Sequence, residues 1–192
     1  MREPADLHSL YIANCVLNAF LSYTAIMLNS VTIHAIRKTS SLPTPLKTLL
    51  LSLAVSDLGV GVLVQPLFVA RIVMGLEQNI GNPMYQRTDI AFLITVNVFA
   101  FASLFGVMAL SGDRFLAIYL HLRYQELVTH KSVVAVVISI WVLSAILSLV
   151  AFTNSGNIDD VIRAIIGAAC TITITFLNIK IYVAVRRHAN QI

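Results

Sequence analysis

Residues 48–70 read TLLLSLAVSDLGVGVLVQPLFVA, a stretch in which Asp57 is the only charged side chain. A helix rises about 1.5 Å per residue, so roughly 20 apolar residues cross a hydrocarbon core of about 30 Å. A mid-span carboxylate costs about 2.5–3.5 kcal/mol, whereas each Leu, Val or Phe favours insertion by about 0.3–0.6 kcal/mol. The thirteen Leu, Val and Phe residues from Leu49 to Val69 therefore outweigh Asp57. The stretch is predicted to be a transmembrane helix with one acid inside the membrane.

Four further charge-poor stretches accompany this one. Residues 11–36, 90–112 and 132–158 contain no Asp, Glu, Lys or Arg, and residues 164–185 contain only Lys180. The apolar runs are continuous and do not alternate, which favours helices over a β-barrel. The composition, 58% hydrophobic and 11% charged, is typical of membrane proteins. We predict an all-α membrane protein with a single domain, 1–192, and five transmembrane helices at about 11–37, 46–74, 88–120, 132–153 and 161–187.

The basic residues predict the orientation. Cytoplasmic loops of membrane proteins carry an excess of Lys and Arg. If the N-terminus is extracellular, nine basic residues lie toward the cytoplasm, and these are Arg37, Lys38, Lys47, Arg114, Arg123, Lys131, Lys180, Arg186 and Arg187. Only four lie outside, and these are Arg2, Arg71, Arg87 and Arg163. We therefore predict an extracellular N-terminus. The small positive net charge reflects topology, and we expect no nucleic-acid partner.

Two charged features are candidates for function. An intramembrane acid such as Asp57 usually faces the bundle interior and marks a functional site; the alternative is a protonated side chain bonded to a neighbouring helix. Asp113-Arg114-Phe115 stands at the cytoplasmic end of the third predicted span. An adjacent acid and base could be an ordinary solvated pair. This pair is a more specific signal of function, because it stands at the end of a long uncharged span and follows an intramembrane acid in the sequence.

These residues resemble the landmarks of rhodopsin-like (class A) G-protein-coupled receptors. The matching features, in order, are Asn29, Leu53-Ala54-Val55-Ser56-Asp57, Asp113-Arg114-Phe115, Trp141 and Tyr182. Adenosine-receptor-like members are the most similar, on Gly61, Pro66, Leu122-Arg123-Tyr124 and Leu127-Val128-Thr129. The sequence ends at Ile192, before a sixth span, so the resemblance covers five helices of an incomplete seven-transmembrane bundle.

The resemblance implies a receptor in the plasma membrane that couples an extracellular ligand to a heterotrimeric G protein. Asp113 would hold Arg114 at rest, and on activation Arg114 would approach Tyr182.

The resemblance also implies a polar site inside the membrane. Asp57, Ser103 and Asn29 would form it, and Asp57 and Ser103 would hold a sodium ion as an allosteric modulator. We expect no other cofactor.

Two structural roles follow from the same resemblance. Pro66 would kink the second helix, with its freed carbonyl bonded by neighbours or water. Trp141 would pack between helices; the alternative for Trp141 is an ordinary apolar membrane residue.

The sequence also departs from this family. Asp89 stands where the third span of such receptors begins with cysteine, and Ile174 replaces the usual proline of the fifth span. Cys15 and Cys170 both lie in apolar runs and are expected to be free thiols, because buried cysteine usually behaves as a small apolar residue. We predict no disulfide.

Other functions remain as alternatives. The chain could be a truncated, non-signalling membrane protein that associates with full-length receptors in an oligomer. A small transporter or channel with Asp57 as an ion relay is less favoured, because there is no inverted repeat. No metal-ligand cluster, nucleophile–base pair or phosphate-binding loop supports an enzyme.

Overall fold

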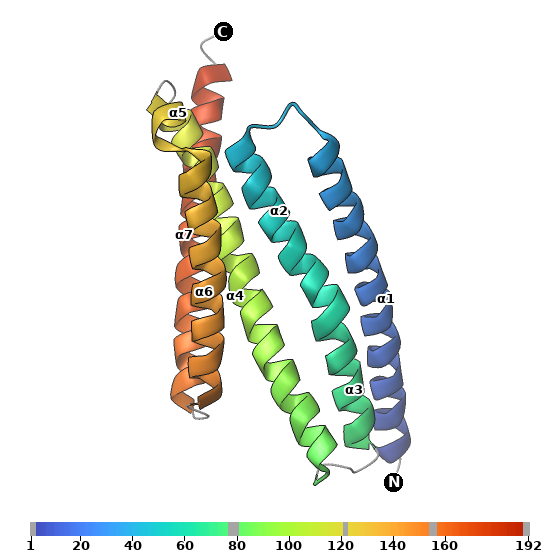
Figure 1. Ribbon diagram of the computed structural model, residues 1–192. Helices are drawn as coiled ribbons and strands as arrows, with labels where there is room; N and C mark the ends of the chain where they lie inside the picture. Colours follow the sequence, from blue (N-terminus) through green and yellow to red (C-terminus); the bar gives the residue numbers. More distant parts are fainter. Residues whose placement is uncertain (1–2, 77–80, 121–122, 154–156, 190–192) are drawn as a thin grey trace.

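The bundle begins with two long antiparallel segments joined by a short loop. The computed structural model describes residues 3–76, 81–120, 123–153 and 157–189. Helix α1 spans Glu3–Lys38, and the chain returns through Thr44–Leu76 (Figure 1). Pro43 precedes this second segment and Pro45 lies in its first turn, where the missing N–H of proline costs no helical hydrogen bond.

The second segment is one membrane span made of three pieces. These are α2 (Thr44–Gly59), the π-helical turn η1 (Val60–Val64) and α3 (Gln65–Leu76). The N–H of Gln65 reaches back five residues to the carbonyl of Val60. In a regular helix the ring of Pro66 would clash with the carbonyl four residues earlier, and the wider π-turn directly before it accommodates the ring. Pro66 thus lies in the first turn of α3, just after the π-turn of the second span.

Gly61 lets η1 approach α1 closely. A Cβ at this position would lie 3.0 Å from Cγ1 of Ile26 and 3.1 Å from the carbonyl oxygen of Ser22. The hydroxyl of Ser22 donates to the carbonyl of Gly61 at 2.7 Å. Small residues and side-chain hydrogen bonds of this kind hold membrane helices together, because lipid supplies no hydrophobic drive for their association.

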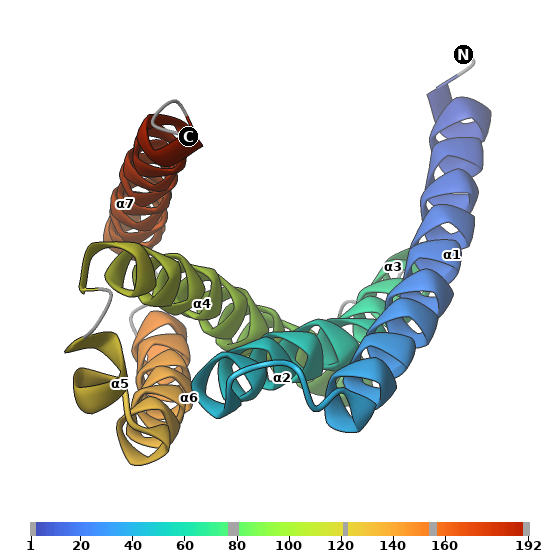
Figure 2. The ribbon, with the colours of Figure 1, turned by 90° about the horizontal axis from the view of Figure 1, so that it is seen from above.

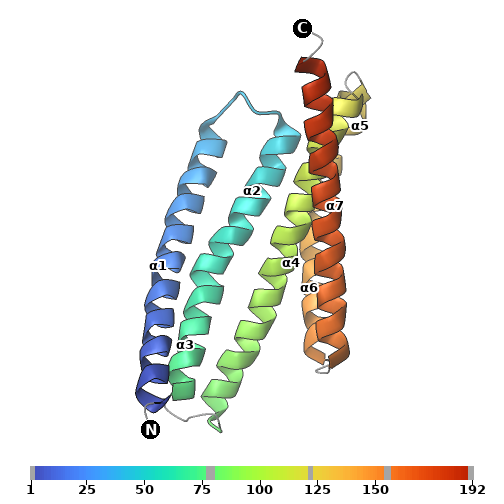
Figure 3. The same ribbon diagram turned by 180° about the vertical axis from the view of Figure 1, so that it is seen from behind.

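Helix α4 (Pro83–Leu120) is the centre of the bundle. It contacts α2, η1 and α3 on one side and α6 (His130–Thr153) and α7 (Asn157–Ala189) on the other (Figures 2 and 3). The core of its contact with α6 and α7 consists of Phe101, Phe105, Ile140 and Cys170. The short helix α5 (Tyr124–Leu127) lies between α4 and α6 in the chain.

Among the described residues, five helical segments are long and apolar enough to cross a membrane, as predicted. They are Ser9–Lys38, Thr44–Leu76, Pro83–Leu120, His130–Ala151 and Ala164–Ala184. At most 22% of the most apolar window of any of them is buried inside the protein. Large apolar side chains such as Phe20 and Ile172 are exposed instead, which fits a surface covered by lipid.

The ends of the helices give the bundle two distinct faces. The end of α1, the start of α2, the end of α4 and the end of α7 lie at the same end, opposite the N-terminus (Figure 1). Arg37, Lys38, Lys47 and Arg114 all lie at this end, which is the one predicted to face the cytoplasm. The Asp113-Arg114 pair therefore lies at the predicted inner face.

Candidate functional site

The polar site inside the membrane joins α2 to α4. The Ser103 hydroxyl on α4 donates to Oδ1 of Asp57 on α2, with 3.1 Å between the oxygens. The hydroxyls of Ser103 and Ser56 are 3.0 Å apart, and Ser56, 1% exposed, also bonds the carbonyl of Leu53 at 2.7 Å. The structure thus brings together Asp57 and Ser103, and adds Ser56 to them.

Asn29, the third residue expected at the polar site, forms a hydrogen bond along α1. Its side-chain amide donates to the carbonyl of Ala25, one turn earlier in α1, at 2.9 Å. The hydrogen bond of Asn29 therefore stays within its own helix, and the polar site of the described structure is built by α2 and α4.

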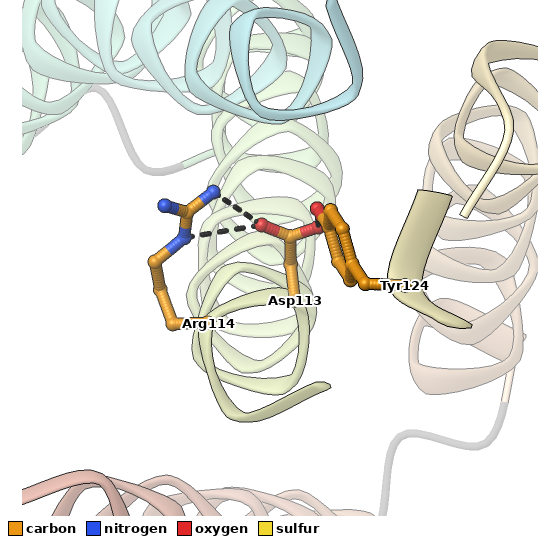
Figure 4. A network of polar contacts seen from close by, with 3 residues as sticks. All are labelled: Asp113, Arg114 and Tyr124. Carbon is orange, nitrogen blue, oxygen red and sulfur yellow. Dashed lines mark hydrogen bonds and ion pairs between the residues drawn. The ribbon is translucent and has the colours of Figure 1, made fainter. Parts of the chain in front are cut away.

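Asp113 is a buried charge at the predicted inner face. It is 5% exposed, and the Arg114 guanidinium donates to its Oδ2 from Nη2 at 2.6 Å and from Nε at 3.1 Å. The Tyr124 hydroxyl in α5 donates to the other carboxylate oxygen, Oδ1, at 2.5 Å (Figure 4). A buried charge is stable only when it is paired and hydrogen-bonded, and here both oxygens of the carboxylate have partners.

Tyr124 is a neutral donor in this cluster. Burial, the hydrogen bond to Asp113 and the charge of that carboxylate together raise the pKa of Tyr124 to about 12, against a lowering effect of Arg114. Ionising the phenol would place a second negative charge against Asp113 and remove the donated proton. In the sequence, Tyr124 belongs to a segment that resembles the second cytoplasmic loop of the family, but that pattern predicts no role for it. Leu122, in the same segment, lies outside the described residues.

Among the described residues, neither Phe115 nor Tyr182 forms a hydrogen bond or ion pair with Asp113. The ring of Phe115 packs against Tyr119, one turn further along α4, with centroids 4.3 Å apart. Tyr182 is 63% exposed on α7. In this arrangement Arg114 is paired with Asp113, and Tyr182 is available on the neighbouring helix.

Trp141 links α6 to α2 and α4. Its indole N–H donates to the hydroxyl of Ser52 at 3.1 Å. The ring of Phe99 meets the indole edge to face, with centroids 5.9 Å apart and planes at 88°. Trp141 therefore makes a polar and an aromatic contact, and each one joins two helices.

The sequence pattern does not predict the ion pair that lies at the opposite end of the bundle. Arg71 on α3 pairs with Asp89 on α4, and the Arg71 guanidinium lies over the ring of Phe92, 5.3 Å from its centroid. The two charged residues are eighteen positions apart, and only the facing of α3 and α4 shows that they meet. Asp89, noted in the sequence as a departure from the family, is one half of this link between helices.

Comparisons with known proteins agree with this architecture. The model of the family described as 7 transmembrane receptor (rhodopsin family) matches residues 28–186. Adenosine receptor A2b of Gallus gallus is 31% identical over 134 residues, 70% of this chain and 37% of the relative. The Bos taurus protein of that name is 31% identical over 75% of this chain and 40% of its own length, and the Canis lupus familiaris one is 30% identical over 79% and 43%. The chain thus spans roughly two fifths of these relatives. With five helices long and apolar enough to span a membrane in its described part and a family match over most of its length, the chain belongs to the rhodopsin family of seven-transmembrane receptors.

Proposed function

We propose that this chain is the five-helix part of a G-protein-coupled receptor of the plasma membrane. The receptor would relay the binding of an extracellular ligand to a heterotrimeric G protein on the cytoplasmic side. The observation that carries the proposal is the Asp113 cluster: a buried carboxylate at the predicted inner face that holds Arg114 through two donors and Tyr124 through a third.

Such a cluster can act as a switch because its charges have two alternative arrangements. The arrangement with Asp113 paired to Arg114 would be the resting state, and the ion pair itself supports this assignment. When the helices move, Arg114 leaves the carboxylate and extends toward Tyr182 of α7. A ligand and a G protein that both favour the second arrangement would be coupled through it, since each shifts the same equilibrium.

The polar site between α2 and α4 would regulate this equilibrium. Asp57, Ser103 and Ser56 present one carboxylate and two hydroxyl oxygens close together, and hard cations prefer oxygen ligands. Sodium bound there would strengthen the contact between α2 and α4 and favour the resting arrangement. The donor set fits the ion, and water would complete its shell.

Adenosine is the ligand to test first, because the relatives reported above are adenosine receptors. The extracellular ends of α3 and α4, where Arg71 and Asp89 meet, would line the entrance to its binding site.

The proposal is tested by nucleotide exchange on purified heterotrimeric G proteins. The chain would be joined to the part of the chicken adenosine receptor A2b beyond the matched region, and exchange would be measured with and without adenosine. We expect exchange that requires Arg114, so Arg114→Ala abolishes it. Arg123→Ala is the matched control, because it removes an exposed arginine of the same face, and it should leave exchange intact. Equal loss in both variants, at equal surface expression, would refute the role of Arg114.

A further inference from the structure

The loop between α1 and α2 carries an unused pair of hydroxyl groups next to two basic residues. The sequence there is Arg37-Lys38-Thr39-Ser40-Ser41. Ser40 and Ser41 are exposed, and neither hydroxyl has a hydrogen-bond partner among the described residues. The loop lies at the same end of the bundle as Asp113 and Arg114 (Figure 1). We propose that Ser40 is a phosphorylation site for a serine/threonine kinase that selects basic substrates.

The neighbouring hydroxyls are poorer acceptors of phosphate. Thr39 is half-buried, and its hydroxyl donates to the carbonyl of Ala35 at 2.9 Å, so it closes the last turn of α1. Ser41 is exposed, but Thr39 occupies the position two residues before it. Ser40 has Arg37 three residues before it and Lys38 two residues before it, and both side chains are exposed. Kinases discriminate substrates by charge patterns of this kind, and two cations upstream match an acidic recognition groove.

The reaction is phosphoryl transfer from ATP. The hydroxyl oxygen of Ser40 attacks the γ-phosphorus, the bond between that phosphorus and the bridging oxygen breaks, and ADP leaves. The hydroxyl proton passes to the catalytic base of the kinase. The product carries about −1.5 to −2 charges at neutral pH, next to Arg37 and Lys38.

Lys47 ties this site to the fold. Its ammonium group, on the first turn of α2, donates to the carbonyl of Arg37 at 3.1 Å and to that of Thr39 at 3.3 Å. These bonds satisfy carbonyls at the end of α1, where the helix leaves them without internal partners. A kinase needs the segment before Ser40 extended, so Lys47 opposes phosphorylation by holding the last turn. Once attached, the phosphate competes with the two carbonyls for the ammonium group and weakens the link between α1 and α2.

The test uses the full chain, purified in lipid nanodiscs, with the catalytic subunit of cyclic-AMP-dependent kinase and ATP. Mass spectrometry of digested samples locates the phosphate. We expect one phosphate on Ser40, absent in Ser40→Ala and unchanged in Ser41→Ala. Arg37→Gln should slow the reaction by about tenfold, because a charge-assisted contact with the kinase is lost. Lys47→Gln should accelerate it several-fold, because the last turn of α1 is released.

Several outcomes would overturn the proposal. They are no incorporation into the folded chain, phosphate on Ser41 or Thr44 in its place, or equal rates for the wild type and Arg37→Gln. All substituted side chains except Lys47 are exposed, so loss of folding does not explain such results. The Lys47→Gln variant is checked by its unfolding midpoint.

The same digest of chain expressed in human cells gives a second test. Phosphate on Ser40 is expected there, since the loop is predicted to face the cytoplasm. Its absence in cells whose kinase is activated would count against the site.

Discussion

Replacing Gly59 by alanine should push two helices apart at one defined point. Gly59 has φ −60° and ψ −37°, so its backbone suits any residue, and space alone requires glycine. A Cβ there would lie 2.5 Å from Cζ and 2.9 Å from Cδ1 of Phe99 on α4. The Phe99 ring already meets Trp141 edge to face, so it cannot move away freely.

The size of the effect follows from two opposing contributions. Alanine is favoured over glycine in a helix by about 0.8–1.0 kcal/mol, and overpacking a filled site costs about 1–3 kcal/mol. Gly167→Ala is the matched control, because a Cβ built at Gly167 on α7 would meet no described atom within 4 Å other than its chain neighbours and the adjacent backbone of its own helix. The helix-propensity gain is common to both variants and cancels when they are compared. The Gly59 variant should therefore be less stable than the Gly167 variant by about 1–3 kcal/mol.

Cys170 supplies the assay, since it is 7% exposed within the core cluster. In a Cys15→Ser background, a thiol-reactive fluorescent dye reports heating-induced exposure of Cys170 in detergent. At about 2–4 °C per kcal/mol for a chain of this size, the midpoint of Gly59→Ala should fall roughly 2–12 °C below that of Gly167→Ala. Adding Phe99→Leu should recover part of the loss, because the smaller side chain makes room. Equal midpoints for the two glycine variants would refute the close packing of α2 against α4.

Three further predictions concern the charged groups. Because the pKa of Tyr124 is raised to about 12 in the folded state, its stabilising contribution is complete below the ordinary tyrosine pKa of about 10 and is lost as the pH rises through about 12. The difference in phenolate absorbance between wild type and Tyr124→Phe should therefore appear only near pH 12. A rise in this difference near pH 10 would contradict the burial of this phenol. Asp57→Asn should remove the effect of sodium on adenosine-stimulated nucleotide exchange, with choline as the control cation, and an unchanged sodium response would exclude this site. The double variant Arg71→Asp with Asp89→Arg should regain the stability that either single change loses. This loss is about 0.2–1 kcal/mol at these partly exposed positions and smaller at high salt. If the losses of the two single variants simply add in thermal unfolding, the pair contributes no coupling.

Hydropathy predicted the number of spans because each helix must satisfy its own backbone in lipid, and this demand leaves a long apolar run in the sequence. The break in the second span was only partly foreseen. Pro66 predicted a distortion, but a π-turn at Val60–Val64 depends on how the freed carbonyl groups are accommodated by the whole bundle.

For the site residues too, some contacts could be predicted from the sequence and others depend on how the helices pack. An acid within a span must find a polar partner, so a partner for Asp57 on another helix could be expected, and Ser103 provides it. The contact of Tyr124 with Asp113 could not be expected, because it depends on the path of the short loop that carries α5. Asn29 and Tyr182 belong to the predicted set, but Asn29 bonds its own helix and Tyr182 is exposed. Which partner such a residue takes is decided by helix rotation, which spacing along the chain does not specify.

The measurement that most directly tests the proposed role of the Asp113 cluster is ligand-independent nucleotide exchange. The protein used is the chain joined to the remaining part of the chicken adenosine receptor A2b, carrying Asp113→Asn. Losing a charge-assisted hydrogen bond costs about 1.5–3 kcal/mol, so the resting arrangement should lose at least about tenfold in its population relative to the active one. Basal exchange should then rise clearly above wild type, and adding Arg114→Ala should return it to the level of empty membranes. A basal rate equal to wild type in Asp113→Asn, at matched surface expression, would contradict the claim that Asp113 holds Arg114 in the resting state.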